Sequence, residues 1–240
     1  MLSNMLNTPV ASFTCLLKAI TSMAGVVSRS VFCSVVVMFM AFIGLGLWPH
    51  TATAAASRAP VVLVLGDSLS AEYGIKRGSG WVQLLSERLE QQKFRWQVVN
   101  ASVSGETSSG GRSRLPALLQ QHRPRIVIIE LGANDGLRGL SLDATRQNLR
   151  TMIQAAQQSG ARVLLVGMQL PPNFGISYTR DFADLFRQLA KERKTALVPF
   201  LLEGIAADLS YFQDDRIHPN EKAQVRLLDN VWGGLLPLLK

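Results

Sequence analysis

The apolar run from Val61 to Leu65 constrains the fold more than any other stretch of this chain. Five consecutive β-branched or leucine residues, ended by Gly66, are typical of a strand buried on both faces, as in a parallel sheet. In open α/β sheets, ligands bind beyond the carboxyl ends of the strands. Ser68 lies there, and we expect it near the start of a helix, where backbone N–H groups favour negative charge. Ser68 is therefore a candidate nucleophile; the alternative is a helix cap.

Strand-like and helix-like segments alternate through the rest of the chain. Helices are expected around the apolar stripe at 81–89, over 115–122 with Pro116 in the first turn, over 142–156, around 182–190, and from Pro219 onwards. A polar loop is expected at 102–111. This alternation predicts one doubly wound α/β domain. Its five parallel strands are expected at 61–65, 96–101, 126–131, 162–168 and 196–200.

The first 56 residues differ in composition from the rest. They contain two basic residues, no acidic residue and an apolar run at 31–48, followed by the small residues of 52–56. This pattern is typical of a signal peptide, with cleavage after Ala54 or Ala56. We therefore expect a signal peptide at 1–56 and a periplasmic or secreted domain at 57–240. The alternative is an uncleaved membrane anchor, because about 18 apolar residues are just enough to span a bilayer.

The composition of the domain at 57–240 limits its partners. Two of the 25 basic residues and none of the 17 acidic residues lie in the first 56, so the domain carries a net charge of +6. Its basic residues are scattered, which argues against nucleic-acid binding but allows transient contact with a membrane surface. Both cysteines precede the domain, so it has no internal disulfide. We expect a monomer.

A serine nucleophile needs a base to remove its proton, and that base must itself be oriented. The domain contains two histidines. His122 follows a polar segment and is expected at the surface. His218 lies three residues after Asp215, in a turn before the last helix, so that one segment supplies a base and a carboxylate. The alternative for His218 is a loop residue that bonds only to local backbone.

Acyl transfer also requires hydrogen-bond donors for the oxyanion of the transition state. The backbone N–H groups of Ser68 and Gly105 are candidates, since glycine lets the chain approach a ligand closely. The Asn134 side chain, which follows the third expected strand, adds a further donor. The alternative for Asn134 is a turn or cap residue.

These segments together resemble the ordered sequence blocks of the SGNH (GDSL-type) hydrolases. The resemblance covers the whole domain and is strongest to the bacterial periplasmic thioesterases, lysophospholipases and arylesterases of that family. Its blocks are Gly66-Asp67-Ser68-Leu69-Ser70, Gly105, Gly132-Ala133-Asn134-Asp135 and Asp215-Arg216-Ile217-His218-Pro219.

The resemblance implies a role for each residue of these blocks. Ser68 is expected to be the nucleophile, His218 the general base and Asp215 its orienting partner, with no metal or cofactor. The implied fold is the flavodoxin-like three-layer α/β/α sandwich. Two residues depart from the subgroup: Arg216 stands where a glycine is usual, and Glu72 where a small residue is frequent. Both departures bear on substrate preference.

The sequence therefore predicts a secreted serine hydrolase that cleaves small acyl esters and thioesters, including lysophospholipids, through an acyl-enzyme. A carbohydrate acetylesterase of the same family and a noncatalytic flavodoxin-like binding domain are the alternatives. Apolar loop residues favour acyl substrates, although each of them could simply pack under a loop. The candidates for an acyl-chain groove are Leu137, Leu140, Leu170, Pro171 and Phe174.

Overall fold

The computed structural model describes residues 59–240, so the expected signal peptide at 1–56 lies outside the described residues. Five parallel strands form one sheet in the order β2-β1-β3-β4-β5. The predicted strands are confirmed, and each of the five ends one or two residues away from the expected position. Their observed bounds are β1 Val61–Gly66, β2 Gln97–Asn100, β3 Ile126–Glu130, β4 Arg162–Val166 and β5 Ala196–Val198.

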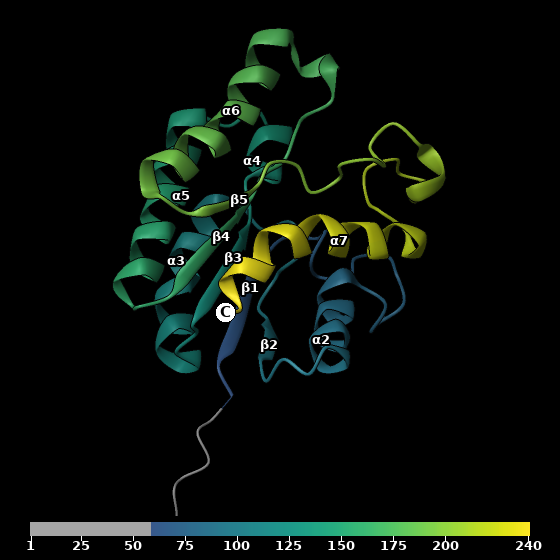
Figure 1. Ribbon diagram of the computed structural model, residues 1–240. Coiled ribbons are helices and arrows are strands. Elements are labelled where there is room, and N and C mark those ends of the chain that lie inside the picture. Colours follow the sequence, from purple (N-terminus) through teal and green to yellow (C-terminus); the bar gives the residue numbers. More distant parts are fainter. Residues whose placement is uncertain (1–58) are drawn as a thin grey trace, which may run out of the picture. The chain divides into compact units, whose positions relative to one another are not determined.

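Helices cover both faces of the sheet, which makes the three-layer α/β/α sandwich that the sequence predicts (Figure 1). On one face lie α3 (Ser108–His122), α5 (Leu142–Gln158) and α6 (Ile176–Arg193), and on the other α2 (Trp81–Gln91) and α7 (Gln224–Leu235). The order is that of the flavodoxin-like doubly wound fold, whose ligands bind where β1 and β3 diverge. The shorter helices are α4 Ala133–Leu137, η1 Pro172–Phe174, η2 Leu209–Tyr211, η3 Glu221–Ala223 and η4 Leu236–Leu238.

The core forms where the apolar stripes of the helices meet the sheet. Every residue of β1 and β3 is buried, as expected for strands covered on both faces. Phe182 and Phe186 of α6 are fully buried and pack edge to face, with ring centroids 5.3 Å apart. The register sets Gly66 opposite Glu130, so the ends of β1 and β3 lie side by side. This fixes the edge at which the candidate site is built.

Ser68 does not lie at the start of a helix, contrary to expectation. Successive turns occupy 68–74, and α2 begins only at Trp81. Glu72 has a φ of 58° and Gly74 a φ of 69°, both in the left-handed region. A right-handed helix does not continue through such residues. Ser68 therefore lies in a turn and not at the N-terminus of a helix.

Helix α3 begins earlier than the sequence suggests, and Pro116 lies in its interior rather than in its first turn. The Thr107 side chain caps the helix by accepting the Gly110 N–H. Gly111 then lies so close to the sheet that a Cβ at this position would collide with Leu131. Tertiary packing thus stabilises a helix through residues of low helix propensity.

The last helix does not begin at Pro219. This proline forms an isolated antiparallel bridge with Phe212, and a 3₁₀ turn at Glu221–Ala223 precedes α7. Pro219 therefore ends the loop that carries His218, and the Asn220 side chain caps the 3₁₀ turn through the Lys222 N–H.

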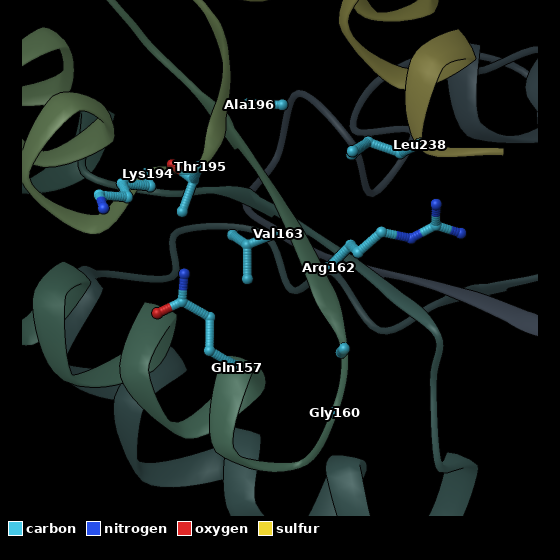
Figure 2. Close-up of a pocket in the computed structure, with 9 residues that line it drawn as sticks. Gln157, Gly160, Arg162, Val163, Lys194, Thr195, Ala196 and Leu238 are labelled. Atoms are coloured by element: carbon cyan, nitrogen blue, oxygen red, sulfur yellow. The ribbon is translucent and has the colours of Figure 1, made fainter. Parts of the chain in front are cut away.

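At the end of the sheet opposite the candidate site, where β4 and β5 begin, lies a hollow of about 380 Å³ (Figure 2). Its walls include Gln157, Arg162 and Thr195, and none of its lining residues is a predicted site residue. The Arg162 side chain points away from Gln157 and donates to the Lys240 carbonyl oxygen.

No helix within residues 59–240 is both long and apolar enough to cross a membrane.

Candidate active site

The structure brings Ser68, His218 and Asp215 together beyond the carboxyl end of β1. Ser68 Oγ lies 3.0 Å from His218 Nε2, and His218 Nδ1 lies 2.6 Å from Asp215 Oδ2. With its hydrogen on Nδ1, the imidazole donates to the carboxylate and accepts the serine O–H on Nε2. Ser68 and the His218 ring are half-buried, with 20% of the His218 side chain exposed. The geometry is that of a nucleophile, a base and an orienting acid.

The loop at 214–219 holds Asp215 and His218 in place through its own backbone. Asp215 Oδ1 accepts the N–H groups of Ile217 and His218, each at 2.9 Å. Partial burial tends to raise the pKa of Asp215, but the backbone and ring donors of His218 outweigh it and lower the pKa to about 2. Asp215 is therefore a carboxylate throughout the neutral range. Arg216 completes the turn with a φ of 58°, a conformation that glycine adopts at lower cost.

Asn134 is held at the site by two acceptors. Its Nδ2 group donates to Asp67 Oδ2 at 3.1 Å and to the Glu106 carbonyl oxygen at 3.0 Å. Asp67 in turn accepts the Leu69 N–H on Oδ1 at 3.0 Å. The amide is thus fixed in one orientation, and donation to a substrate oxygen requires it to share one of these hydrogens.

Gly105 lies on the exposed loop after β2 with a φ of 77°, so a side chain at this position would be strained. Arg138, which follows α4, donates from Nη2 to the Gly105 carbonyl oxygen at 3.1 Å. The Arg138 contact thus holds the peptide unit that directly follows the expected oxyanion donor, the Gly105 N–H.

Two buried carboxyl groups lie directly beneath the serine turn. Glu130, fully buried at the end of β3, accepts the Ser70 O–H at 2.7 Å and the Asp67 N–H at 3.3 Å on Oε2. Burial, followed by the charge of Asp67, raises the pKa of Glu130 well above its usual value. Burial also raises the pKa of Asp67 from 3.8 to about 6, against the lowering effect of the Leu69 N–H and the His218 charge. Burial thus favours the neutral form of both carboxyl groups.

Asp135, next to Asn134 in sequence, is a structural residue. It is buried and accepts the Ser108 N–H at 2.8 Å and the Ser108 O–H at 2.5 Å. Thr145 donates to the same carboxylate, and Asn148 donates to the Ser108 hydroxyl. Asp135 thus joins α4, the helix that carries Asn134, to α3 and α5.

The side chain of Glu72 is bound within its own loop. It accepts the Gly78 N–H on both carboxylate oxygens and the Gly80 N–H on one, at 2.9 to 3.1 Å. It thereby holds the segment that leads into α2. Glu72, which the sequence analysis linked to substrate preference, thus stabilises its own loop in the structure.

An apolar cavity of about 310 Å³ opens between the segments that carry Asn134 and His218. Ala133 lies next to Asn134 in sequence and Ile217 next to His218, and both line the cavity. Of the five groove candidates, Leu137, Leu170 and Pro171 line it. Leu140 and Phe174 are not among its lining residues: Leu140 is exposed, and Phe174 packs against the core. Arg216 lines the cavity as well.

Sequence reasoning missed three side chains that contact this site. Glu130 ends an apolar run, and an acidic residue in such a run was the one sequence signal for a special role. Its burial against Ser70 and Asp67 could not be deduced from the sequence. Tyr73 lies against the His218 ring, and Gln213 donates hydrogen bonds to the carbonyl oxygens of Tyr73 and His218.

His122, expected at the surface, is half-buried at the end of α3. Within residues 59–240, no three side chains of the kinds that bind metals gather into a cluster.

The sequence of this domain matches a known family. Residues 64–226 match the GDSL-like lipase/acylhydrolase family. The chain belongs to this family. Because its relatives are esterases, the protein is an SGNH hydrolase of ester bonds.

Three relatives illustrate the similarity. The chain is 51% identical over 181 residues to esterase TesA of Pseudomonas aeruginosa, which covers 75% of this chain and 90% of the relative. It is 43% identical over 184 residues to thioesterase 1/protease 1/lysophospholipase L1 of Escherichia coli strain K12, covering 77% and 87%. The crystal structure of esterase EstA from Pseudoalteromonas sp., inhibited by monoethylphosphonate, superimposes with a TM-score of 0.72 at 38% identity, covering 75% of this chain and 98% of that one.

Proposed function

We propose that this esterase hydrolyses acyl esters and thioesters through an acyl-enzyme on Ser68. His218 takes the proton from Ser68 Oγ as the oxygen attacks the carbonyl carbon. The same imidazolium then donates the proton to the leaving alcohol or thiol as the carbon–oxygen or carbon–sulfur bond breaks. A water molecule, deprotonated by His218, hydrolyses the acyl-enzyme, and the proton returns to Ser68. Asp215 orients the ring and stabilises its positive charge.

The Ser68–His218–Asp215 hydrogen-bonded chain carries this proposal. The phosphonate inhibition of the relative from Pseudoalteromonas supports it, because phosphonates react with activated serines. In the proposed site the backbone N–H groups of Ser68 and Gly105 and the Asn134 amide bind the oxyanion. Asn134 then shares the hydrogen that it gives to the Glu106 carbonyl oxygen.

The apolar cavity supports acyl chains, rather than acetylated sugars, as the part of the substrate that is recognised. Leu137, Leu170 and Pro171 give it a lining to which an alkyl chain transfers favourably from water. The names of the relatives make thioesters and lysophospholipids reasonable members of the substrate set. We also propose that the enzyme is an exported monomer that meets lipid surfaces transiently.

Replacement of the nucleophile tests the proposal. Ser68→Ala is expected to abolish turnover of p-nitrophenyl butyrate without changing the thermal unfolding curve. A fluorophosphonate probe is expected to label the wild-type protein at Ser68 alone, as located by peptide mass spectrometry. Ser70→Ala, two residues away, is the matched control for loss of a hydroxyl in this turn and is expected to remain labelled. Labelling of the Ser68→Ala protein, or retained activity, would show that the nucleophile is wrong.

A further inference from the structure

Tyr73 lies against the ring of His218, a contact that the proposed mechanism does not use. The two ring centroids are 4.4 Å apart, and the planes are tilted by 42°. Tyr73 is 49% exposed, so this ring is not part of the core that stabilises the fold. Because the Tyr73 ring is half-exposed and still contacts the expected base, its burial does not explain its position.

The backbone on both sides of this contact is tied together by Gln213. Its Nε2 group donates to the Tyr73 carbonyl oxygen at 2.9 Å and to the Pro219 carbonyl oxygen at 3.1 Å. Its own N–H donates to the His218 carbonyl oxygen at 2.8 Å. Gly74, with a φ of 69°, lies so close that a Cβ there would collide with the Gln213 side chain. The turn after β1 is thus clamped to the loop that carries the base.

We infer that Tyr73, held by Gln213, is a positioning residue that stabilises the imidazolium form of His218 during acyl transfer. This inference rests on the proposed function, because the imidazolium forms only when His218 takes the serine proton. A cation is attracted to the face of an aromatic ring within about 6 Å of the ring centroid. The attraction is absent while the imidazole is neutral, so it acts on the transition state more than on the ground state.

Several charged groups also face His218. Asp215 accepts from Nδ1, Asp67 interacts with the ring charge from beneath the serine, and Arg216 lies in the same loop. These groups are unchanged when Tyr73 is replaced. A difference between variants at position 73 therefore reports on the ring alone.

Two substitutions at one position separate the ring from its bulk. Tyr73→Leu keeps apolar cover over His218 but removes the π face, whereas Tyr73→Phe keeps the face. For p-nitrophenyl butyrate we expect Tyr73→Leu to lower kcat about 2- to 5-fold at unchanged KM. The acidic limb of kcat/KM is expected to move about 0.4 to 0.7 of a pH unit lower, because the imidazolium is less stable. Tyr73→Phe is expected to restore the wild-type kcat and limb.

The clamp is tested by a double-mutant cycle. Gln213→Leu removes both side-chain donors and is expected to lower kcat by a similar factor, and the Tyr73→Leu/Gln213→Leu protein to lose no more than the worse single variant. Independent, multiplicative losses would overturn the clamp. A raised KM at unchanged kcat, or limbs that superimpose, would overturn the role of Tyr73.

A readout without turnover separates this inference from the proposed function. The His218 ring is titrated by NMR in the Ser68→Ala protein, with the His122 ring as internal reference. Tyr73→Leu in this background is expected to lower the His218 midpoint and leave that of His122 in place; an unmoved His218 midpoint overturns the inference. A wild-type protein with no esterase activity would instead overturn the proposed function, whatever the NMR midpoint shows.

Discussion

Replacement of Asp67 by asparagine is expected to make the protein less dependent on pH for its stability while it damages the active site. Asp67 is 1% exposed and accepts the backbone N–H of Leu69 and the side-chain amide of Asn134. Asparagine has the same shape but carries no charge and presents an amide where Asn134 needs an acceptor. The two effects are measured separately, by unfolding and by turnover.

The size of the stability effect follows from the pKa of Asp67, which burial raises from 3.8 to about 6. A carboxyl group whose pKa is raised by folding contributes stability that is fully present below pH 3.8 and lost as the pH rises through about 6. At about 1.4 kcal/mol per pH unit, this loss amounts to about 3 kcal/mol. Asparagine does not titrate, and without the Asp67 charge the pKa of Glu130 is raised less. Both the loss of Asp67 titration and the smaller rise in the pKa of Glu130 make the free energy of unfolding less dependent on pH.

Urea denaturation at pH 4 and pH 7 tests this expectation. Between the two pH values the free energy of unfolding is expected to fall by about 2 kcal/mol more for the wild type than for Asp67→Asn, because part of the titration lies below pH 4. Asp184→Asn, which removes an exposed carboxylate from α6, is the control and is expected to parallel the wild type. At pH 7, kcat of Asp67→Asn is expected to be about 10- to 100-fold lower, from loss of a hydrogen bond to a charged acceptor. Parallel stability curves for wild type and Asp67→Asn would refute the argument.

Three further substitutions test other parts of the site. Asn134→Ala is expected to lower kcat about 100- to 1,000-fold with little change in KM, because the amide meets the oxygen fully only in the tetrahedral state; a raised KM at unchanged kcat would make it a substrate-positioning residue. His218→Ala is expected to cost as much kcat/KM as Ser68→Ala, since the two act as a unit, whereas His122→Ala stays near wild type. Leu170→Trp, in the cavity wall, is expected to shift the preferred p-nitrophenyl ester to a shorter chain across the C2 to C16 series; an unchanged optimum would place the acyl chain elsewhere.

The sheet and the meeting of the candidate catalytic residues were predictable because their signals are local. Buried parallel strands need continuous apolar runs, so Val61–Leu65 and Ile126–Leu131 are recognisable without any tertiary information. Asp215 and His218 are three residues apart, and one turn is enough to bring them together. The strand ends then define where Ser68 meets them.

The remaining features depend on contacts between distant segments. The start of α3 is fixed by the close approach of Gly111 to Leu131 and by Asp135, which accepts from the first residue of the helix. The role of Glu130 depends on its burial beneath Ser70, 60 residues away in sequence. The turn after β1 leaves the helical path at Glu72, a residue type for which left-handed backbone is uncommon. None of these follows from composition or periodicity.

The distance of 150 residues between Ser68 and His218 has a consequence for the order in which the enzyme becomes active. Ribosomes complete the nucleophile turn early, but the base emerges only with the last part of the chain. That part is then fastened to the beginning, through the Gln224 side chain on the Trp81 N–H and the Arg88–Asp229 ion pair. In the proposed mechanism an incomplete chain therefore contains an unactivated serine, and hydrolysis begins only after synthesis has ended.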